Sequence, residues 1–337
     1  MTENTICPFI FLSDREIVDR GLELDIDEFF KKRMDEHKGA QDAYERAKES
    51  FPDCELYEKE PWTFLKLIVV GYYIDIYTNI AKNYFNRVAY FDFYAGPGVN
   101  YIKRLNLYVG GSPYIAKNRP KDAKKFDDLI LFELDDIKAK SLQIIIPDAK
   151  VNCLDCNSIQ SKRIIEKVMS KDQHYLAFID PEGIEEIKWS TLQHLFQFNG
   201  DIIINYPYSA IAREHGKFYG KHIDSIKEKS GNLLTDFFGN TDWKGIGKSM
   251  KQGDQLLELF IKQIGNIFPT YEIIQLGQER GGFKFHLIIA TKREHAPWFE
   301  GVRNVKQFIS KTTLTELKRI ADVHSGVQKC LTDYFQT

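Results

Sequence analysis

Short apolar runs alternate with amphipathic stretches along most of the chain. The runs that predict strands cover residues 89–94, 129–133, 150–154, 175–179, 201–206, 271–275 and 283–290. Between them, the helical spacing of apolar residues predicts helices over residues 113–118, 137–146, 160–170 and 191–198. Such alternation is typical of a doubly wound α/β protein, in which helices cover both faces of a mostly parallel sheet.

The last two runs differ from the others because only a short polar turn, centred on Gly281 and Gly282, separates them. Two strands joined so closely should pair antiparallel as a hairpin. Seven strands that close with such a hairpin describe the class I methyltransferase sheet better than the all-parallel, six-stranded dinucleotide-binding fold. The sequence therefore predicts an α/β, Rossmann-like class I methyltransferase fold with a seven-stranded, mostly parallel sheet.

Charge and hydrophobicity divide the chain into three parts. Residues 1–60 are rich in charge with helical spacing and are expected to form an accessory helical segment. Residues 61–296 should form the methyltransferase-like domain, which begins with a strongly apolar helix over residues 63–85 that must pack on the sheet. A mostly polar, helical insertion is expected within this domain at about residues 209–268, and residues 297–337 should form a helical tail.

The overall charge excludes a globally basic protein. The 337 residues include 46 Lys and Arg against 48 Asp and Glu, a formal net charge of −2, so no broad positive field indicates nucleic acid, although a local basic groove stays open. The five scattered cysteines make no disulfide framework and fit a reducing cytoplasm. Because no run of roughly 18 uncharged apolar residues is present, we expect a cytoplasmic protein without a membrane partner.

The most informative stretch, residues 90–98, reads as a buried strand that runs into a glycine turn. Its sequence is Tyr-Phe-Asp-Phe-Tyr-Ala-Gly-Pro-Gly, with the carboxylate of Asp92 inside the apolar run. Burying a charge is costly unless it meets hydrogen-bond donors or a ligand. Gly96 and Gly98 lack the side chains that would keep a small molecule away from the backbone. Together they predict a nucleotide-like cofactor at the carboxyl end of this strand.

Three more acids follow predicted strands. Glu133 ends the second strand, where it can accept both ribose hydroxyls of a nucleoside. Asp155 follows the third strand, placed to meet an adenine amino group, and Asp180 follows the fourth. One carboxylate after a strand is a commonplace turn former, but four in register at one edge of a sheet favour a binding site.

The segment after Gly98 argues against a dinucleotide site. In the glycine fingerprint of dinucleotide-binding proteins, a helix begins immediately after the glycines. Here residues 99–110 intervene, and Ser112 is the expected N-cap of the next helix. This disfavours a nicotinamide dehydrogenase, whereas a sulfonium cofactor without a phosphate does not need the helix there. A zinc site at Cys153 and Cys156 is also disfavoured, because no second cysteine or histidine pair completes four ligands.

The order of these motifs resembles the three-Cys-motif partner protein family (TcmP) over roughly residues 58–299. The motifs are Lys66 before the first strand, residues 92–98, Gly111-Ser112-Pro113 up to Ala116, Phe132-Glu133, residues 155–157, residues 178–183 with Trp189 and Leu192, and the closing hairpin. More distantly, the glycine-serine-proline segment followed by a strand-ending glutamate is similar to the ribosomal RNA adenine-N6 methyltransferases of the bacterial large subunit.

The resemblance implies S-adenosyl-L-methionine as the cofactor. By position, Asp92, Gly96 and Gly98 would line its methionine part, Glu133 the ribose, and Asp155 the adenine. Lys66 and Ser112 match residues that help to hold the cofactor in the ribosomal enzymes. The cofactor-binding set would be completed by Ala95, Pro97, Leu134, Cys156, Asn157 and Asp180.

The acceptor site implied by the resemblance opens at Asp180 and Pro181. Amino methyltransferases use an acid or amide, two prolines and an aromatic residue that stacks on the flipped base. Here Glu182 and Gly183 stand where the second proline and the aromatic residue would be. Glu182 is either a proton acceptor toward the incoming nucleophile or a surface carboxylate in a turn.

A candidate replacement follows the fifth strand, where Asn205, Tyr206 and Tyr208 offer an amide and two aromatic rings. Either ring could provide the missing stacking face, and stacking is worth about 1–3 kcal/mol per base. The alternative is that both tyrosines pack against the insertion.

Two functional hypotheses remain open. The first is a methyltransferase that acts on a nitrogen of a nucleic acid, RNA above all, by direct in-line displacement and without a metal. The second is a cofactor-binding or catalytically degenerate module that serves as a scaffold for another protein. The missing stacking residue favours the second hypothesis, and the complete set of acids favours the first. The family's name refers to a separate cysteine-containing protein, so the resemblance implies a protein partner of that type.

Overall fold

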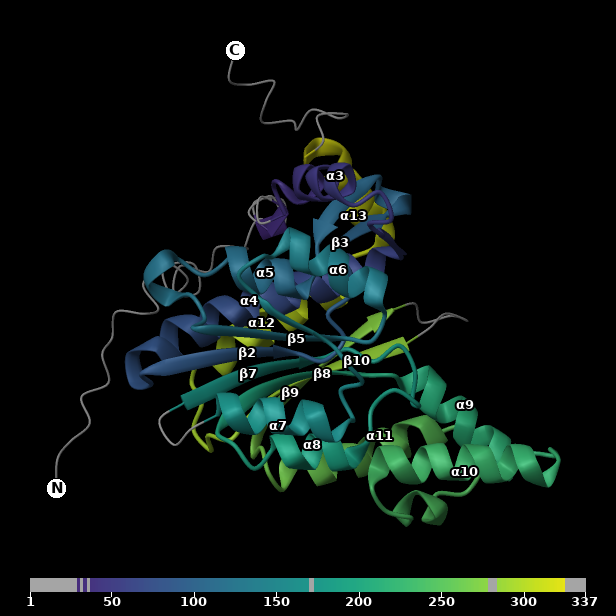
Figure 1. Ribbon diagram of the computed structural model, residues 1–337. Coiled ribbons are helices and arrows are strands. Elements are labelled where there is room, and N and C mark those ends of the chain that lie inside the picture. Colours follow the sequence, from purple (N-terminus) through teal and green to yellow (C-terminus); the bar gives the residue numbers. More distant parts are fainter. Residues whose placement is uncertain (1–28, 31–32, 35–36, 170–172, 278–283, 325–337) are drawn as a thin grey trace, which may run out of the picture.

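Seven strands form a central sheet in the part of the chain that the computed structural model describes, residues 29–30, 33–34, 37–169, 173–277 and 284–324 (Figure 1). From one edge to the other, the strands are β6 (Lys150–Cys153), β5 (Asp128–Glu133), β2 (Arg87–Asp92), β7 (Gln173–Ile179), β8 (Gly200–Tyr206), β10 (Lys284–Thr291) and β9 (Thr270–Gly277). Each strand lies where an apolar run predicted one, with small differences at the ends.

The sheet has the predicted direction pattern. Strands β6, β5, β2, β7 and β8 run parallel, and β10 lies antiparallel between β8 and β9. The predicted hairpin is confirmed, whereas its turn residues Gly281 and Gly282 lie outside the described residues. Counted along the chain, the strand order is 3-2-1-4-5-7-6. The molecule therefore has the Rossmann-like class I methyltransferase fold.

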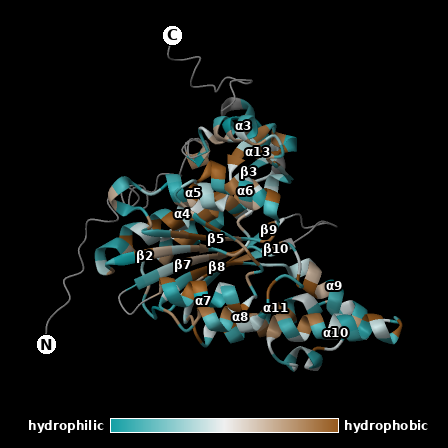
Figure 2. Ribbon diagram, in the orientation of Figure 1, coloured by the Kyte–Doolittle hydropathy of each residue, from teal (hydrophilic) through white to brown (hydrophobic). Residues whose placement is uncertain are grey.

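Helices cover both faces of the sheet (Figure 1). One face carries α4 (Pro61–Tyr84), α5 (Ser112–Asn118), α6 (Asp136–Ile145) and α12 (Phe299–Lys311). α13 (Leu314–His324) packs against the short 3-10 helix Lys103–Leu105. The other carries α7 (Ile159–Val168), α8 (Trp189–Leu195) and α11 (Gln252–Gly265). Because alternate side chains of β7 are buried in these two cores, the strand is apolar from Tyr175 to Ile179, and the central strands are largely brown in Figure 2.

Helix α4 is the apolar helix predicted before the first strand, and it begins slightly earlier, with Pro61 at its first turn. By length and composition alone, this helix could cross a membrane, but 67% of its most apolar window is buried inside the protein. A helix buried in a protein core meets the same criteria of length and composition. Its residues Ile68, Tyr73 and Ile74 are fully buried against the sheet, so α4 is a structural helix that positions Lys66.

A second, small sheet was missed by the sequence analysis. It consists of β1 (Tyr57–Lys59), β3 (Val99–Ile102) and β4 (Leu107–Gly110), with a short 3-10 helix between β3 and β4. β1 pairs parallel with β3, and β3 pairs antiparallel with β4. α3 (Ala40–Ser50) packs against β3 and β4. The delay before α5, which the sequence predicted, is therefore a folded hairpin rather than an irregular loop.

The predicted insertion is helical and forms an arm beyond the end of the sheet (Figure 1). α9 (Tyr208–Tyr219) follows β8 directly and packs against α10 (Asp224–Phe238). α11 then returns, and its Leu256, Phe260 and Ile264 join the core beneath the sheet. We call residues 208–251 the α9–α10 arm. Because the arm starts at the carboxyl end of β8, it lies beside any site built there.

Candidate active site

A cavity of about 1100 Å³ opens at the carboxyl ends of β2, β5, β6 and β7. This is the edge at which ligands bind in open α/β sheets. Nearly all of the cofactor residues predicted from the sequence line it: Lys66, Ala95, Gly96, Pro97, Gly98, Ser112, Glu133, Leu134, Asp155, Cys156, Asn157 and Asp180. Pro181, Glu182 and Asn205 of the predicted acceptor site line it as well.

Asp92 lies beneath the cavity rather than on its surface, because its side chain is fully buried. Its carboxylate accepts hydrogen bonds from Ser112 Oγ at 2.6 Å, Tyr90 Oη at 3.0 Å and the Tyr94 backbone N–H at 3.2 Å. Burial raises the pKa of Asp92 to about 7, although the three donors act in the opposite direction. Asp92 therefore orients the cavity-lining Ser112 instead of lining the cavity itself.

Ser112 is not the N-cap that the sequence predicted. The N-cap of α5 is Gly111, and Ser112 is the first helical residue. Its hydroxyl donates to Asp92 and not to the helix. A Cβ at position 111 would lie 3.2 Å from the carbonyl oxygen of Gly98, so α5 can approach the glycine turn closely only because residue 111 has no side chain.

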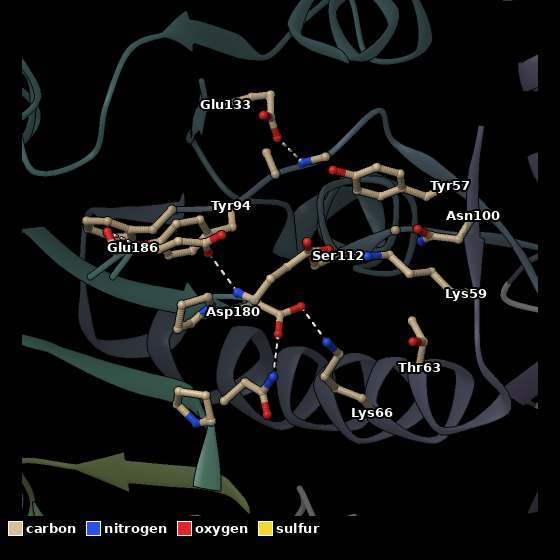
Figure 3. Close-up of a pocket in the computed structure, with 18 of the residues that line it drawn as sticks. Tyr57, Lys59, Thr63, Lys66, Tyr94, Asn100, Ser112, Glu133, Asp180 and Glu186 are labelled. Carbon is tan, nitrogen blue, oxygen red and sulfur yellow. Dashed lines mark hydrogen bonds and ion pairs between the residues drawn. The ribbon is translucent and has the colours of Figure 1, made fainter. Parts of the chain in front are cut away.

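The glycine turn and Glu133 are joined directly (Figure 3). The N–H of Gly96 donates to Glu133 Oε2 at 2.8 Å, and the N–H of Asp135 donates to Glu133 Oε1 at 3.0 Å. Gly96 has a φ of 63°, a conformation that favours glycine. Each oxygen of Glu133 keeps a further lone pair for a ligand hydroxyl. The carboxylate is therefore held at the cavity wall, where the sequence placed a ribose acceptor.

The loop after β6 is braced against the loop after β7 by Asn157. Its amide donates to Asp155 Oδ1 at 3.0 Å and to the Glu186 carbonyl at 2.6 Å. Nearby, Tyr94 Oη also donates to the Glu186 carbonyl, at 2.8 Å, and Cys156 Sγ lies 3.3 Å from that hydroxyl. This network fixes the wall of the cavity on which Asp155 stands.

The two cysteines of this loop lie in different environments. Burial raises the pKa of Cys156 to about 12, so its thiol stays protonated at neutral pH. Cys153 is exposed and contacts the Leu134 carbonyl. Within the described ranges, no group of three or more His, Cys, Asp or Glu side chains is placed to hold a metal ion.

Asp180 lies between two positioning groups (Figure 3). Lys66 Nζ of α4 donates to Asp180 Oδ2 at 2.5 Å, and Asn205 Nδ2 of β8 donates to Asp180 Oδ1 at 2.7 Å. The next residues lead to the mouth of the cavity, where Glu182 Oε1 pairs with Lys59 Nζ at 2.5 Å. The Glu182 side chain is 65% exposed, so it lies in contact with solvent.

The two tyrosines proposed as a stacking face do not line the cavity. Tyr206 is fully buried on the opposite side of the sheet, with its ring 5.1 Å from Phe260 and 5.9 Å from Phe237. The prediction of a stacking role is wrong for Tyr206, because successive side chains of a strand point to opposite faces and Asn205 takes the cavity side. Tyr208 lies in the first turn of α9, and its hydroxyl donates to Asp254 at 2.7 Å. Packing against the insertion is thus the correct alternative for both.

Several cavity residues were not predicted. Tyr57 and Lys59 reach the cavity from β1, Trp62 from the start of α4, Glu186 from the loop after β7, and Phe285 from β10. β1 is too short to give a periodic signal. Phe285 had a signal, since it lies near the start of the apolar run 283–290, whose partner strands end at this edge.

The strand order and this acidic cavity at the strand ends define the class of the molecule as a Rossmann-like α/β protein with a class I methyltransferase fold. No family model matches the chain, and no curated protein sequence matches it either.

Solved structures with similar folds exist. A Legionella pneumophila protein of the DUF519 family has 14% sequence identity and a TM-score of 0.46, over 74% of this chain and 92% of that one. A Bacillus cereus O-methyltransferase in complex with SAH has 11% identity and a TM-score of 0.38, over 83% of this chain and 97% of that one. A Streptococcus thermophilus rRNA methylase has 8% identity and a TM-score of 0.31, over 65% and 95%. At these values the likenesses carry no argument about activity.

Proposed function

We propose that the protein is an S-adenosyl-L-methionine-dependent methyltransferase, similar to the three-Cys-motif partner family, that methylates a nitrogen of a nucleic acid, RNA above all. The observation that carries this proposal is the arrangement of Glu133, Asp155 and Asp180. These carboxylates come from three separate strands of the sheet and line one cavity together with the glycine turn. A structural role in turns gives no reason for such convergence.

The charge of the cavity supports an adenosyl sulfonium as its ligand. Nine acidic and five basic side chains line it, an excess that suits a positively charged ligand. Glu133 would hold the ribose and Asp155 the adenine. Gly96, whose missing side chain leaves open the space below the Tyr57 ring, would lie against the methionine part. When bound, this cofactor supplies a methyl group on a cationic sulfur.

The acceptor side of the cavity is built around Asp180. Lys66 and Asn205 each use one lone pair of its carboxylate and fix its plane. The remaining lone pairs can accept an N–H of an acceptor amine and so orient the nitrogen. Glu182, exposed at the mouth, would take up the proton that the amine loses and pass it to solvent. Because alignment supplies most of the rate in such a transfer, these positioning contacts are the chemistry that the chain contributes.

The α9–α10 arm supports a polyanionic substrate. Five exposed lysines on it make no ion pair with a described residue: Lys221, Lys229, Lys244, Lys248 and Lys251. Exposed lysines without an ion-pair partner bind the phosphates of a nucleic acid and release its condensed counterions. Such binding gives affinity without sequence preference. The arm begins beside the cavity, since Ser209, Ala210 and Arg213 of α9 line it. A strand that ran along α9 from Lys221 to Ser209 would thus reach the cavity.

A scaffold function is the second candidate. Glu182 and Gly183 replace the second proline and the stacking residue of amino methyltransferases, and this departure favours a protein that binds the cofactor and acts through a partner of the three-Cys-motif type. The two candidates differ in whether a methyl group leaves the cofactor.

Isothermal titration with S-adenosylmethionine, S-adenosylhomocysteine (SAH), NAD and ATP tests the cofactor proposal. We expect binding of the first two only, and a loss of at least tenfold in affinity in Glu133→Ala, because the ribose hydroxyls lose a charged acceptor worth about 1.5–3 kcal/mol. Lys188→Ala is a matched surface control. Tritiated-methyl transfer to RNA, DNA and protein pools then separates the enzyme from the scaffold. Binding of NAD in preference to SAH would refute the proposal.

A further inference from the structure

The acceptor end of the cavity has an aromatic wall that belongs to neither predicted tyrosine. Phe285 of β10 is half-buried and lines the cavity. Its register partner on β9, Leu276, lines the cavity too. Since β10 runs antiparallel to β8, the beginning of β10 lies at the carboxyl end of β8. Phe285 therefore reaches the site directly from a strand, and not from a loop that follows one.

The sheet register places Phe285 next to the polar acceptor groups. Leu287 lies directly opposite Asn205 in the β8–β10 ladder, so these two side chains share a face of the sheet. Phe285 is two residues before Leu287 and therefore points to that same face. Such diagonal neighbours across an antiparallel pair lie within reach of an aromatic side chain. Asn205 in turn donates to Asp180.

The other rings around the cavity have different surroundings. Two lysine ammonium groups lie over the Tyr57 ring, at 4.1 and 4.5 Å from its centroid. Phe93 is 2% exposed, and Tyr94 is anchored to the loop after β7 on the Asp155 side. Trp62, one helical turn before Lys66, is the remaining rival. Among the cavity rings in the described ranges, Phe285 has the strongest claim to the acceptor, because it shares a sheet face with Asn205.

A second observation points to a ligand at the same place. Asn205 is 2% exposed, and its Oδ1 has no hydrogen-bond partner among the described residues. A buried acceptor left in this state costs about as much as a lost hydrogen bond. Its Nδ2 is committed to Asp180, and Oδ1 itself is covered by protein atoms, so a donor in the cavity that Asn205 lines would reach Oδ1 only after a small shift of this side chain. An exocyclic amine has two N–H groups, one for each of these neighbouring residues.

We propose that Phe285 is the stacking face for the acceptor, and that the acceptor is a flat, amine-bearing nucleobase whose two N–H groups donate to Asp180 and to Asn205 Oδ1. This inference rests on the proposed function and deepens it, because it assigns the contact that Gly183 cannot make. Phe285 contacts the base and sets its plane, while Asn205 and Asp180 select for an amine. A base with a carbonyl in place of the amine meets two acceptors and is rejected.

The test uses the full chain and a short single-stranded RNA that carries one 2-aminopurine, a fluorescent base with an exocyclic amine. Neighbouring bases already quench 2-aminopurine in the free RNA, so quenching is judged by comparing the complex of each variant with the wild-type complex, in which stacking on a ring should keep the fluorescence low. Titrations are made with and without saturating SAH. In Phe285→Leu, which keeps the apolar bulk and loses the ring, we expect the quenching to vanish and the affinity to fall about 5- to 150-fold. Phe285→Trp should restore both. Thermal melting of each variant reports folding.

Tyr271→Ala is the matched control. Tyr271 is an aromatic residue of the same hairpin, 37% exposed, and it pairs with Ala290 at the far end of β10, so this variant should quench as the wild type does. Wild-type quenching in Phe285→Leu would overturn the inference, as would its loss in Trp62→Leu alone or its absence in the wild type. SAH binding is measured by calorimetry on the same samples. An absence of SAH binding would refute the cofactor proposal. The fluorescence comparison without SAH would still test whether Phe285 stacks on the base.

Discussion

The buried carboxylate of Asp92 predicts a specific pH dependence of stability. Burial raises its pKa in the folded protein from 3.8 to about 7. A folded-state pKa above the unfolded value contributes stability that is fully present below about pH 4 and is lost as the pH rises to about 7. A shift of about three units corresponds to about 4 kcal/mol, since one unit is worth about 1.4 kcal/mol.

The variant Asp92→Asn isolates this contribution, because an amide keeps the shape and does not titrate. The free energy of unfolding is measured with urea for the wild type and the variant at a series of pH values between about 4 and 8. The difference, wild type minus variant, should fall by about 4 kcal/mol up to about pH 7 and then stay level. All other titrating groups are common to both proteins, so their contributions cancel in this difference. One of them is His174, whose lowered pKa makes the folded protein more stable as the pH rises.

Asp201→Asn is the matched control. Asp201 is also a buried strand aspartate, with 4% of its surface exposed, but its pKa is raised only to about 6, so its difference curve should level off about one unit earlier. A flat difference curve for Asp92→Asn would refute the reasoning. A curve that rises with pH would show that the donors Ser112, Tyr90 and Tyr94 outweigh burial and hold the carboxylate ionised.

Three further predictions follow from the packing and the charges. Tyr206→Ala should lower the free energy of unfolding by about 3–5 kcal/mol. Tyr206→Phe should change it by less than about 1 kcal/mol, because the hydroxyl that it removes has no partner in the described part of the chain. Equal losses for the two variants in urea unfolding would contradict this. Gly98→Ala should cost about 1–3 kcal/mol, because φ is 94° and the new Cβ would meet Leu142 at 3.1 Å, while Gly245→Ala, with open space around it, should be neutral. Lys221→Glu combined with Lys229→Glu should weaken RNA binding and flatten its salt dependence by about 1.4 units in slope, about 0.7 for each lost contact with a phosphate of a single strand. An unchanged slope in filter binding would remove the arm from the substrate path.

The strand-ending acids show how far the sequence could be read. Glu133, Asp155 and Asp180 line one cavity as predicted, because the carboxyl ends of parallel strands meet at a single edge whatever the details of the loops. Asp92 was predicted in the same position and lies beneath the surface instead. Its strand ends at Asp92 itself, one residue before the turn, and only the three donors around it reveal why it is buried.

Two failures have physical causes that can be named. Asn205 and Tyr206 are adjacent in a strand, so only one of them can face the cavity, and alternation alone could not decide which. The small sheet depends on pairing between Tyr57–Lys59 and Val99–Ile102, segments that are far apart in the chain. Three-residue strands contain no detectable period, and long-range pairing is invisible in a single sequence. Phe285 was missed for a related reason, since its place depends on the register of β10.

The parallel pairing of β1 with β3 has a consequence for any fragment of this protein. A polypeptide that starts at Pro61 would keep every strand of the large sheet, yet it would strip one neighbour from β3 and expose that strand's N–H and C=O groups. An unpaired strand edge readily forms backbone hydrogen bonds with a strand of another molecule. Such a fragment would therefore tend to self-associate through β3, next to the opening through which ligands must pass.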